Sequence, residues 1–308
     1  MIFDQVSAVT SPIVTAVVLK KARRLLLDIY GGAKAAYSLR AISEAWRDQD
    51  IVEVRRAWDD TTRGFTADDI GDGTLTNWVG TGATDHGYVA TWYDQSGNGN
   101  DAVQNVATSQ PKIIEGGVLV ADGIQFDGHH LACGSLLSGD QSRSTFTVAA
   151  PENDEFFHSF GTLNYNGSMW SLSAEVAMRC KVYVWVSSTP ATYFQNNLIT
   201  NTYSGGSLFS TNAIYLNGNT VTKTSGTDGT VNTDPIGDFK IASLPSGSST
   251  YVGAISEIII YNSDQSAKRT GIEGNINDYY DIFADETYRR PDGSAIFRPD
   301  GTSVYERP

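Results

Sequence analysis

The stretch TWYDQSGNGNDA, residues 91 to 102, places glycines, asparagines, aspartates and a serine directly after two aromatic residues. This composition is typical of a tight turn that follows a strand. Its glycines can adopt positive φ, its asparagines tolerate it, and the side chains of Asp94 and Ser96 can hydrogen-bond backbone amides of the turn. We therefore interpret one run as a fold-defining turn: Tyr93, Asp94, Gln95, Ser96, Gly97, Asn98, Gly99 and Asn100.

The same turn also offers oxygen ligands for a calcium ion, from Asp94, Asn98, Asn100 and Asp101. It lacks the Asp-x-Asp-x-Asp-Gly order and the closing glutamate of a known calcium loop. We therefore prefer the folding role and predict no metal and no cofactor.

From Ala35 onward the sequence alternates apolar and polar residues in short segments, as strands do. Turn dipeptides such as Asn98-Gly99, Asp122-Gly123 and Asn217-Gly218 separate these segments. Helical periodicity is almost absent until residue 264. The pattern predicts a mainly β chain, an antiparallel sandwich of the jelly-roll, concanavalin A-like type.

Two helices are expected at the ends of this sandwich. Residues 12 to 30 can form a helix that opens at Ser11-Pro12 and docks either on its own domain or on another subunit. A second helix is expected in the segment that begins at Ser263, which can cap it, and it closes the domain near Phe283. The expected organisation is a docking arm at 1–32, a sandwich at 33–283 and a tail at 284–308.

The tail contains an internal repeat, RPDGSAIF at 290–297 followed by RPDGTSVY at 298–305. Two such units cannot bury a core alone, so they either fold back on the sandwich or add strands to a neighbour. We prefer the second interpretation, which predicts a homo-oligomer.

Bulk properties exclude some classes of function. The 22 basic and 35 acidic residues give a formal net charge of −13, which repels nucleic acid. Cys133 and Cys180 can form a bridge, but two buried thiols are the preferred interpretation. His129 and His130 are adjacent and are interpreted as loop residues without a metal.

The N-terminal segment does not resemble an export signal. Its apolar run, Ile13 to Leu19, is short and precedes a basic cluster instead of following one. It is also too short to span a membrane, so no membrane insertion is expected. A protein of this kind is expected to stay inside the cell or to leave it by lysis.

Residues 35 to 105 resemble the start of the catalytic domain of the α-L-arabinofuranosidase B family, a concanavalin-like sandwich. The likeness rests on AAYSLRAI, IVEVRRAWDDTTRGF and GYVATWYDQSGNGNDAVQ, which matches the family's Tyr-Asp-Gln-Ser-Gly-Asn-Gly-Asn element. FDG and VGAISEIIIYN extend it over residues 106 to 283, and residues 1 to 30 and 284 to 308 lie outside it. The same kind of domain is associated with tail and fibre proteins of tailed bacteriophages.

The resemblance implies a catalytic glutamate, a catalytic aspartate and a platform of two adjacent cysteines. This sequence has no adjacent cysteines, places Gln195 near the expected glutamate, and has no carboxylate between Ile241 and Ser249. Glu152, Asp154, Glu155 and Glu175 are other carboxylates that can rebuild a pair, although such residues are more often solvated. The sequence therefore leaves hydrolase activity open and favours a protein without it.

Sugar binding needs aromatic faces and polar side chains more than acids with shifted pKa values. The residues closest to polar turns are the preferred glycan ligands, although most aromatics of a sandwich pack in its core: Tyr165, Trp170, Tyr193, Phe194 and Asn196.

These observations predict a bacteriophage virion component, part of a tail, fibre or decoration, assembled in the host cytoplasm. Its sandwich contacts host-surface glycan or other virion proteins. The alternatives are an active arabinofuranosidase-like hydrolase and a purely structural spacer.

Overall fold

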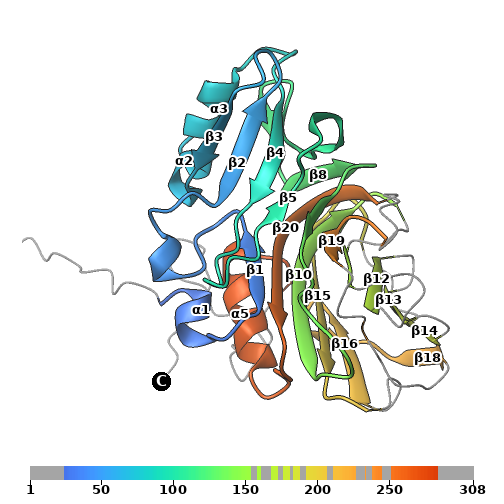
Figure 1. Ribbon diagram of the computed structural model, residues 1–308. Helices are drawn as coiled ribbons and strands as arrows, with labels where there is room; N and C mark the ends of the chain where they lie inside the picture. The colour runs from blue at the N-terminus through green and yellow to red at the C-terminus, as the bar shows by residue number, and fades with distance from the viewer. Residues whose placement is uncertain are drawn as a thin grey trace, which may run out of the picture.

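The computed structural model describes residues 24–153, 158–160, 168–172, 176–180, 183–187, 192–206, 211–226, 233, 238–244 and 251–283. For 168–187 and 223–226 this description covers the backbone alone. The chain is mainly antiparallel β structure, and the predicted sandwich is confirmed (Figure 1). The expected tail and most of the expected docking arm lie outside the described residues.

One sheet is long and runs through the whole molecule. Its neighbouring strands, all antiparallel, follow one another in this order: β3 (Thr62–Phe65), β2 (Val52–Arg56), β4 (Gly87–Trp92), β6 (Lys112–Glu115), β8 (Ile124–Asp127), β20 (Val252–Tyr261), β10 (Arg143–Pro151), β15 (Asn197–Tyr203), β16 (Asn212–Leu216) and β17 (Asn219–Thr220). β7 (Val118–Leu119) pairs with β6, and β1 (Ala35–Ser38) pairs with the second half of β20.

The second sheet lies across the core from the first and begins at β5, which pairs with β4. Its strands are β5 (Ala102–Val103), β9 (Leu131–Cys133), β19 (Phe239–Ile241), β11 (His158–Ser159), β12 (Ser168–Leu172), β13 (Val176–Cys180), β14 (Tyr183–Ser187) and β18 (Lys223–Gly226).

Strand β20 is buried on both of its faces, which explains the continuous apolar run Ile258 to Tyr261. Ile258 and Ile260 belong to the main core between the two sheets. Ile259 and Tyr261 belong to a second apolar cluster on the opposite face. Strand β10 beside it is buried along its whole length for the same reason.

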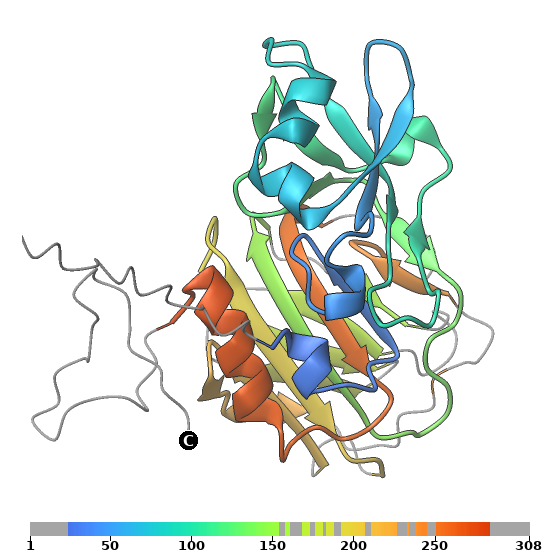
Figure 2. The same ribbon diagram turned by 90° about the vertical axis from the view of Figure 1, so that its left-hand side faces the viewer.

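The second cluster is closed by two helices, α1 (Leu26–Ile29) and α5 (Arg269–Tyr280). Leu26, Ile272 and Ile276 are fully buried there against the sheet. Figure 2 shows α5 lying along the sheet with α1 beside it. α1 has four residues, and the part of the expected N-terminal helix before residue 24 lies outside the described residues.

The start of α5 differs from the expected one. The helix begins at Arg269, and Lys268 precedes it without a side-chain cap. Ser263, six residues before Arg269, instead accepts a hydrogen bond from the side-chain amide of Gln265 at 2.7 Å. Five residues, 264 to 268, with a turn at 266–268, separate Ser263 from the helix, so the expected capping role of Ser263 was wrong.

Two further short helices, α2 (Ala67–Gly71) and α3 (Thr74–Val79), connect β3 to β4 and were not expected from the sequence. Thr66 and Asp69 form a reciprocal capping box at the start of α2. Short 3-10 turns occupy Glu44–Trp46 and Ala107–Ser109. Of the described helices, not one is long and apolar enough to cross a membrane.

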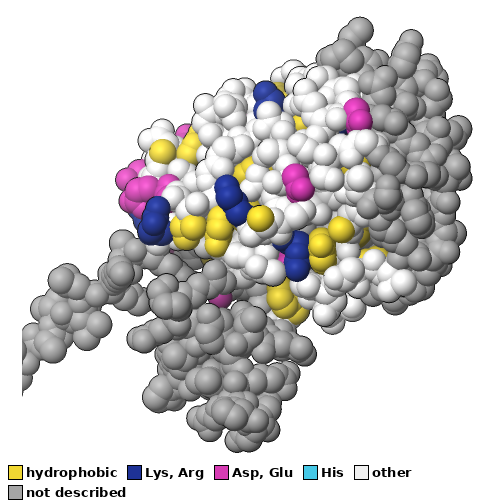
Figure 3. All heavy atoms as spheres, turned by 90° about the horizontal axis from the view of Figure 1, so that it is seen from below, with side chains coloured by type: hydrophobic (Ala, Val, Ile, Leu, Met, Phe, Trp, Pro, Cys, Tyr) yellow, Lys and Arg dark blue, Asp and Glu magenta, His cyan; other side chains and the backbone are white. Residues whose placement is uncertain are grey.

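The face seen from below in Figure 3 carries apolar side chains among basic and acidic ones, and acidic side chains gather at its left edge. In the described part of this face, the apolar side chains do not merge into a continuous patch. Isolated apolar side chains are usual on a protein surface and indicate no binding site by themselves.

Candidate functional site

The turn after β4 is built around the buried carboxylate of Asp94. One oxygen, Oδ1, accepts hydrogen bonds from the backbone N–H groups of Ala36 and Ser96 at 2.8 and 2.9 Å. The other, Oδ2, accepts from the Ser96 hydroxyl and from the Asn100 N–H at 2.8 and 3.0 Å. The turn is therefore closed by its own side chains and is tied to β1.

Gln95 extends this connection. Its amide Nε2 donates to the carbonyls of Ser38 and Arg40, both at 3.0 Å, and its Oε1 accepts from the N–H of Ile42 at 3.0 Å. The side-chain amides of Asn98 and Asn100 donate to the carbonyl oxygens of residues 33 and 34. The turn thus fixes the segment around β1.

Positive φ occurs at Gly97 and Gly99 of this turn, as the sequence suggests, whereas Asn98 and Asn100 do not need it. The oxygens of Asp94 face N–H and O–H donors rather than open space. Among the described residues, no cluster of His, Cys, Asp and Glu has the arrangement of a metal site.

The structure describes four of the five predicted glycan ligands, and these four lie on both sheets. Tyr165 lies outside the described residues, and the backbone of Trp170 lies on β12 in the second sheet, opposite His158 of β11. Tyr193, Phe194 and Asn196 lie in the loop before β15 of the first sheet. These three predicted residues therefore share one loop.

The loop at 192–196 is clasped by the buried side chain of Asn197. Its Nδ2 donates to the carbonyls of Thr192 and Gln195 at 2.7 and 2.8 Å, and its Oδ1 accepts from the Thr192 N–H at 3.1 Å. Phe194 sits at the tip with a φ of 57° and is 69% exposed. A bulky residue in the left-handed region is strained, and such strain is concentrated at functional sites.

Two contacts connect this loop to the rest of the first sheet. The N–H of Phe194 donates to the carbonyl of Pro151 at the end of β10 at 2.9 Å. The side-chain amide of Asn196 donates to the carboxylate of Asp122 at 3.3 Å. Burial raises the pKa of that carboxyl above its usual value.

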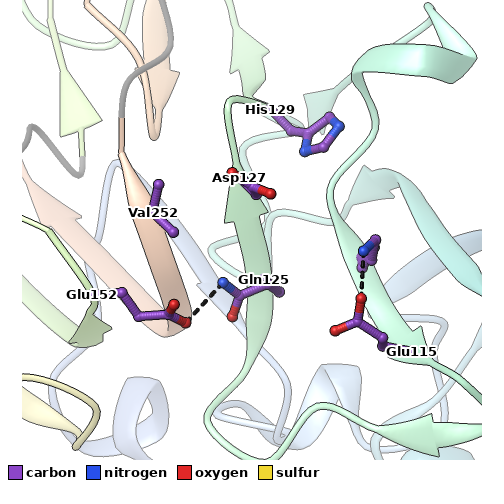
Figure 4. Close-up of a pocket in the computed structure, with 7 residues that line it drawn as sticks. Glu115, Gln125, Asp127, His129, Glu152 and Val252 are labelled. Carbon is purple, nitrogen blue, oxygen red and sulfur yellow. Dashed lines mark hydrogen bonds and ion pairs between the residues drawn. The ribbon is translucent and has the colours of Figure 1, made fainter.

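A polar hollow of about 270 Å³ is lined in part by Glu152, the residue that follows Pro151. Figure 4 shows its side chains across β6, β8 and the start of β20: Glu115, Gln125, Asp127, His129, Glu152 and Val252. Strand alternation places Gln125 and Asp127 here, because the alternate residues of the strand, Ile124 and Phe126, point into the core. Sequence analysis singled out only Glu152 of this group as a candidate site residue.

The polar groups of the hollow have different roles. Glu152 accepts a hydrogen bond from the Gln125 amide at 3.0 Å, and Lys112 donates to Glu115 at 2.5 Å (Figure 4). The Lys112 hydrogen bond lowers the pKa of the Glu115 carboxyl, so this group stays ionised. Burial lowers the pKa of His129, which keeps its imidazole neutral at pH 7. The hollow therefore presents both hydrogen-bond donors and acceptors.

Other expected residues have structural positions. Cys133 is a free thiol, and the Tyr37 hydroxyl lies 3.3 Å from its sulfur. Burial raises the pKa of this thiol to about 12. His130 contacts the Gln104 side chain instead of forming a site with its neighbour. Asp154, Glu155 and Glu175 lie outside the described residues.

These features define an antiparallel β-sandwich with an exposed aromatic loop and a polar hollow on its first sheet. The fold is similar to that of a GH54 α-L-arabinofuranosidase soaked with a cyclic sulfate inhibitor, with a TM-score of 0.58 at 13% identity over 86% of this chain and 66% of that one. A mutant GH54 enzyme soaked with 4-nitrophenyl α-L-arabinofuranoside gives a TM-score of 0.59 at 14% identity, over 86% and 66% of the two chains. An arabinofuranosidase complexed with arabinofuranosyl-α-1,2-xylobiose gives 0.55 at 13% identity, over 82% and 64%.

The chain thus spans slightly less than two thirds of the length of these similar structures. At such identities the likeness defines the fold. No protein-family model matches the sequence, and no curated protein matches it.

Proposed function

We propose that this sandwich binds carbohydrate without cleaving it, as part of a bacteriophage virion component. The observation that carries the binding role is Phe194, an exposed ring held in a strained backbone conformation, whose N–H bonds Pro151, the residue before Glu152 of the polar hollow. An aromatic face beside convergent hydrogen-bonding groups is the usual composition of a sugar site. The fold shared with arabinofuranosidases supports the same class of ligand.

The virion assignment rests on the sequence. The Tyr-Asp-Gln-Ser-Gly-Asn-Gly-Asn element occurs in a kind of domain associated with phage tails and fibres, and the repeated RPDG tail suits contact with a neighbouring subunit. The proposed partners are other virion proteins, further copies of this chain and host-surface glycan. Mass spectrometry of purified particles tests this assignment, and absence of the chain from particles would contradict it.

The binding role is tested by Phe194→Gly, with retention of the protein on immobilised bacterial surface polysaccharide as the readout. Glycine adopts positive φ at no steric cost, so the melting temperature is expected to stay equal or to rise. Retention is expected to fall, because the ring is lost. The matched control is Val106→Ala, at another exposed apolar residue, which is expected to keep retention. Unchanged retention by Phe194→Gly would contradict the proposal.

An active glycoside hydrolase is the alternative, and Asp122 is the observation that favours it. A carboxyl with a raised pKa can remain protonated and act as a general acid, and Asp122 lies against Asn196 of the candidate loop. A hydrolase would release sugar from arabinose-containing polysaccharide, and Asp122→Asn would abolish the release. Binding without release would exclude this alternative for the polysaccharide used.

A further inference from the structure

A second exposed aromatic side chain, Trp58, stands on the hairpin that joins β2 to β3. This hairpin lies at the upper end of the molecule in Figures 1 and 2. The Trp58 side chain is 64% exposed, although an indole is among the largest apolar groups that a fold can bury. Neither the turn at 93–100 nor the loop at 192–196 accounts for it.

The guanidinium group of Arg56 stacks on Trp58 and holds it in place. The guanidinium carbon of Arg56 lies 4.2 Å from the centre of the Trp58 ring and 4.5 Å from that of Trp78. Trp78 in turn packs edge-on against Phe65 of the main core, with ring centres 5.3 Å apart. The exposed indole is therefore connected to the core through Arg56 and Trp78.

Arg56 is itself locked. Its Nε and Nη2 donate to the two carboxylate oxygens of Asp59, both at 2.8 Å, and its Nη1 donates to the Trp78 carbonyl at 3.1 Å. Asp59 also accepts from the Thr61 N–H and hydroxyl at 3.1 and 2.8 Å. A guanidinium with bidentate geometry loses most of its freedom, so the surface it supports is rigid.

Trp58 thus presents an apolar face that is already ordered in the free protein, so binding a ligand costs little additional side-chain entropy. Around it, the hairpin offers polar groups, with the Asp60 side chain 76% exposed and Thr61 and Thr62 also exposed. A flat apolar surface with a hydroxyl and carboxylate rim matches a pyranose, which has C–H groups on one face and hydroxyls at its edge.

Other ligands fit this surface less well. A cation would meet the positive charge of Arg56 under the same ring. A nucleic-acid base would bring phosphates toward a chain with a formal net charge of −13. A protein partner needs an apolar centre, whereas the hairpin residues that follow Trp58, from Asp59 to Thr62, are charged or hydroxylated.

We propose that Trp58 is the platform of a second carbohydrate subsite, which takes a neutral pyranosyl unit and is carried on strands separate from the loop at 192–196. The proposed function supplies only the class of ligand. The platform itself follows from the stacked arrangement of Trp58, Arg56 and Trp78. A chain with two subsites would hold a polysaccharide more tightly than one with either alone.

The test is calorimetric titration of the full chain with cellopentaose and with lactose, each at millimolar concentration. Trp58→Ala is expected to weaken binding at least about tenfold, whereas Trp58→Phe, which keeps a ring, retains most of it. Arg56→Lys is also expected to weaken binding, since a lysine cannot bind Asp59 bidentately and supports the ring less firmly. The effect should be smaller than that of Trp58→Ala, because the indole is kept. Val118→Ala removes another exposed apolar side chain and serves as the control.

The melting temperature separates binding from folding. A merely structural Trp58 would lower the melting temperature in Trp58→Ala and leave the affinity for sugar unchanged, which would overturn the proposal. If the wild-type chain binds neither sugar, the proposal is also overturned. The same holds if Trp58→Ala loses self-association but keeps its affinity for sugar. Phe194→Gly is titrated in parallel, so that failure at the loop is distinguished from failure at Trp58.

Discussion

The carboxylate of Asp94 is buried and accepts four hydrogen bonds, three of them from backbone N–H groups. Replacing it by an amide turns one acceptor oxygen into a donor that faces other donors. Asp94→Asn is therefore expected to lower the free energy of unfolding by about 3 kcal/mol, measured by urea denaturation. The exposed Asp48→Asn is the control and should stay within about 0.5 kcal/mol of the wild type. Equal effects of the two changes would contradict this account of the turn.

His158 makes folding sensitive to pH. It is fully buried on β11, and burial lowers the pKa of its imidazole from 6.5 to about 3. Between pH 6.5 and pH 3 the unfolded chain therefore binds a proton at this histidine that the folded chain does not bind. The contribution of His158 to stability is fully present above pH 6.5 and is lost as the pH falls toward 3. Between pH 7 and pH 5 this loss is about 2 kcal/mol.

Urea denaturation of His158→Gln at both pH values tests this assignment. The variant lacks the titrating group, so its loss of stability between pH 7 and pH 5 should be smaller than that of the wild type by about 2 kcal/mol. An equal loss in both proteins would assign the pH dependence to other groups.

Residue chemistry could be predicted from the sequence where the contacts are local. The hydrogen bonds from Ser96 to Asp94 span two residues, and the composition of the turn indicates them. The contacts of Gln95 with Ser38 and Arg40 span more than fifty residues and leave no local pattern. The exposure of Trp58 was also invisible, because alternation along a strand does not show how a hairpin tip is covered.

At the scale of elements, α5 is held by the apolar side chains it presents to β10, β15 and β20. Ile276→Ala removes buried methylene groups from this cluster and is expected to destabilise the fold by about 2 to 5 kcal/mol. The exposed Tyr279→Ala on the same helix is the control, expected to cost clearly less. Comparable midpoints in urea for the two variants would mean that α5 is not docked as described.

The long apolar segments were the easiest elements to predict, since β20 reads as a continuous run and α5 has buried residues four apart. The helices α2 and α3 have five and six residues, too few for helical periodicity to appear. A local signal was nevertheless present, because Thr66 and Asp69 have the spacing of a capping box.

At the scale of the whole molecule, the described fold closes at Phe283. Asn277 near the end of α5 accepts hydrogen bonds from the N–H groups of Ile282 and Phe283, both at 2.9 Å, and donates to the Phe283 carbonyl at 2.7 Å. Removal of residues 284–308 is therefore expected to leave the melting temperature unchanged. We propose that these residues join copies of the chain, so removal should lower the number of chains per particle, calculated from the mass measured by light scattering. An equal number of chains with and without them would contradict that role.

The polar hollow combines residues from β6, β8 and the start of β20 with Glu152, so only the folded sheet brings them together. In the sequence, the turn at 93–100 indicates the sandwich and the aromatic residues indicate the loop. Lys112 and Gln125 belong to no motif, and His129 was interpreted as a loop residue, so their meeting in one hollow could not be predicted. The sugar-binding proposal consequently depends on the structure for its geometry.

Carbohydrate binding without cleavage is tested with an array of bacterial surface and plant glycans probed with the full chain, reading retained protein and released sugar from the same spots. Retention without release is the expected result. Release of sugar from the spots that retain the protein, or the absence of retention on every glycan of the array, would contradict it.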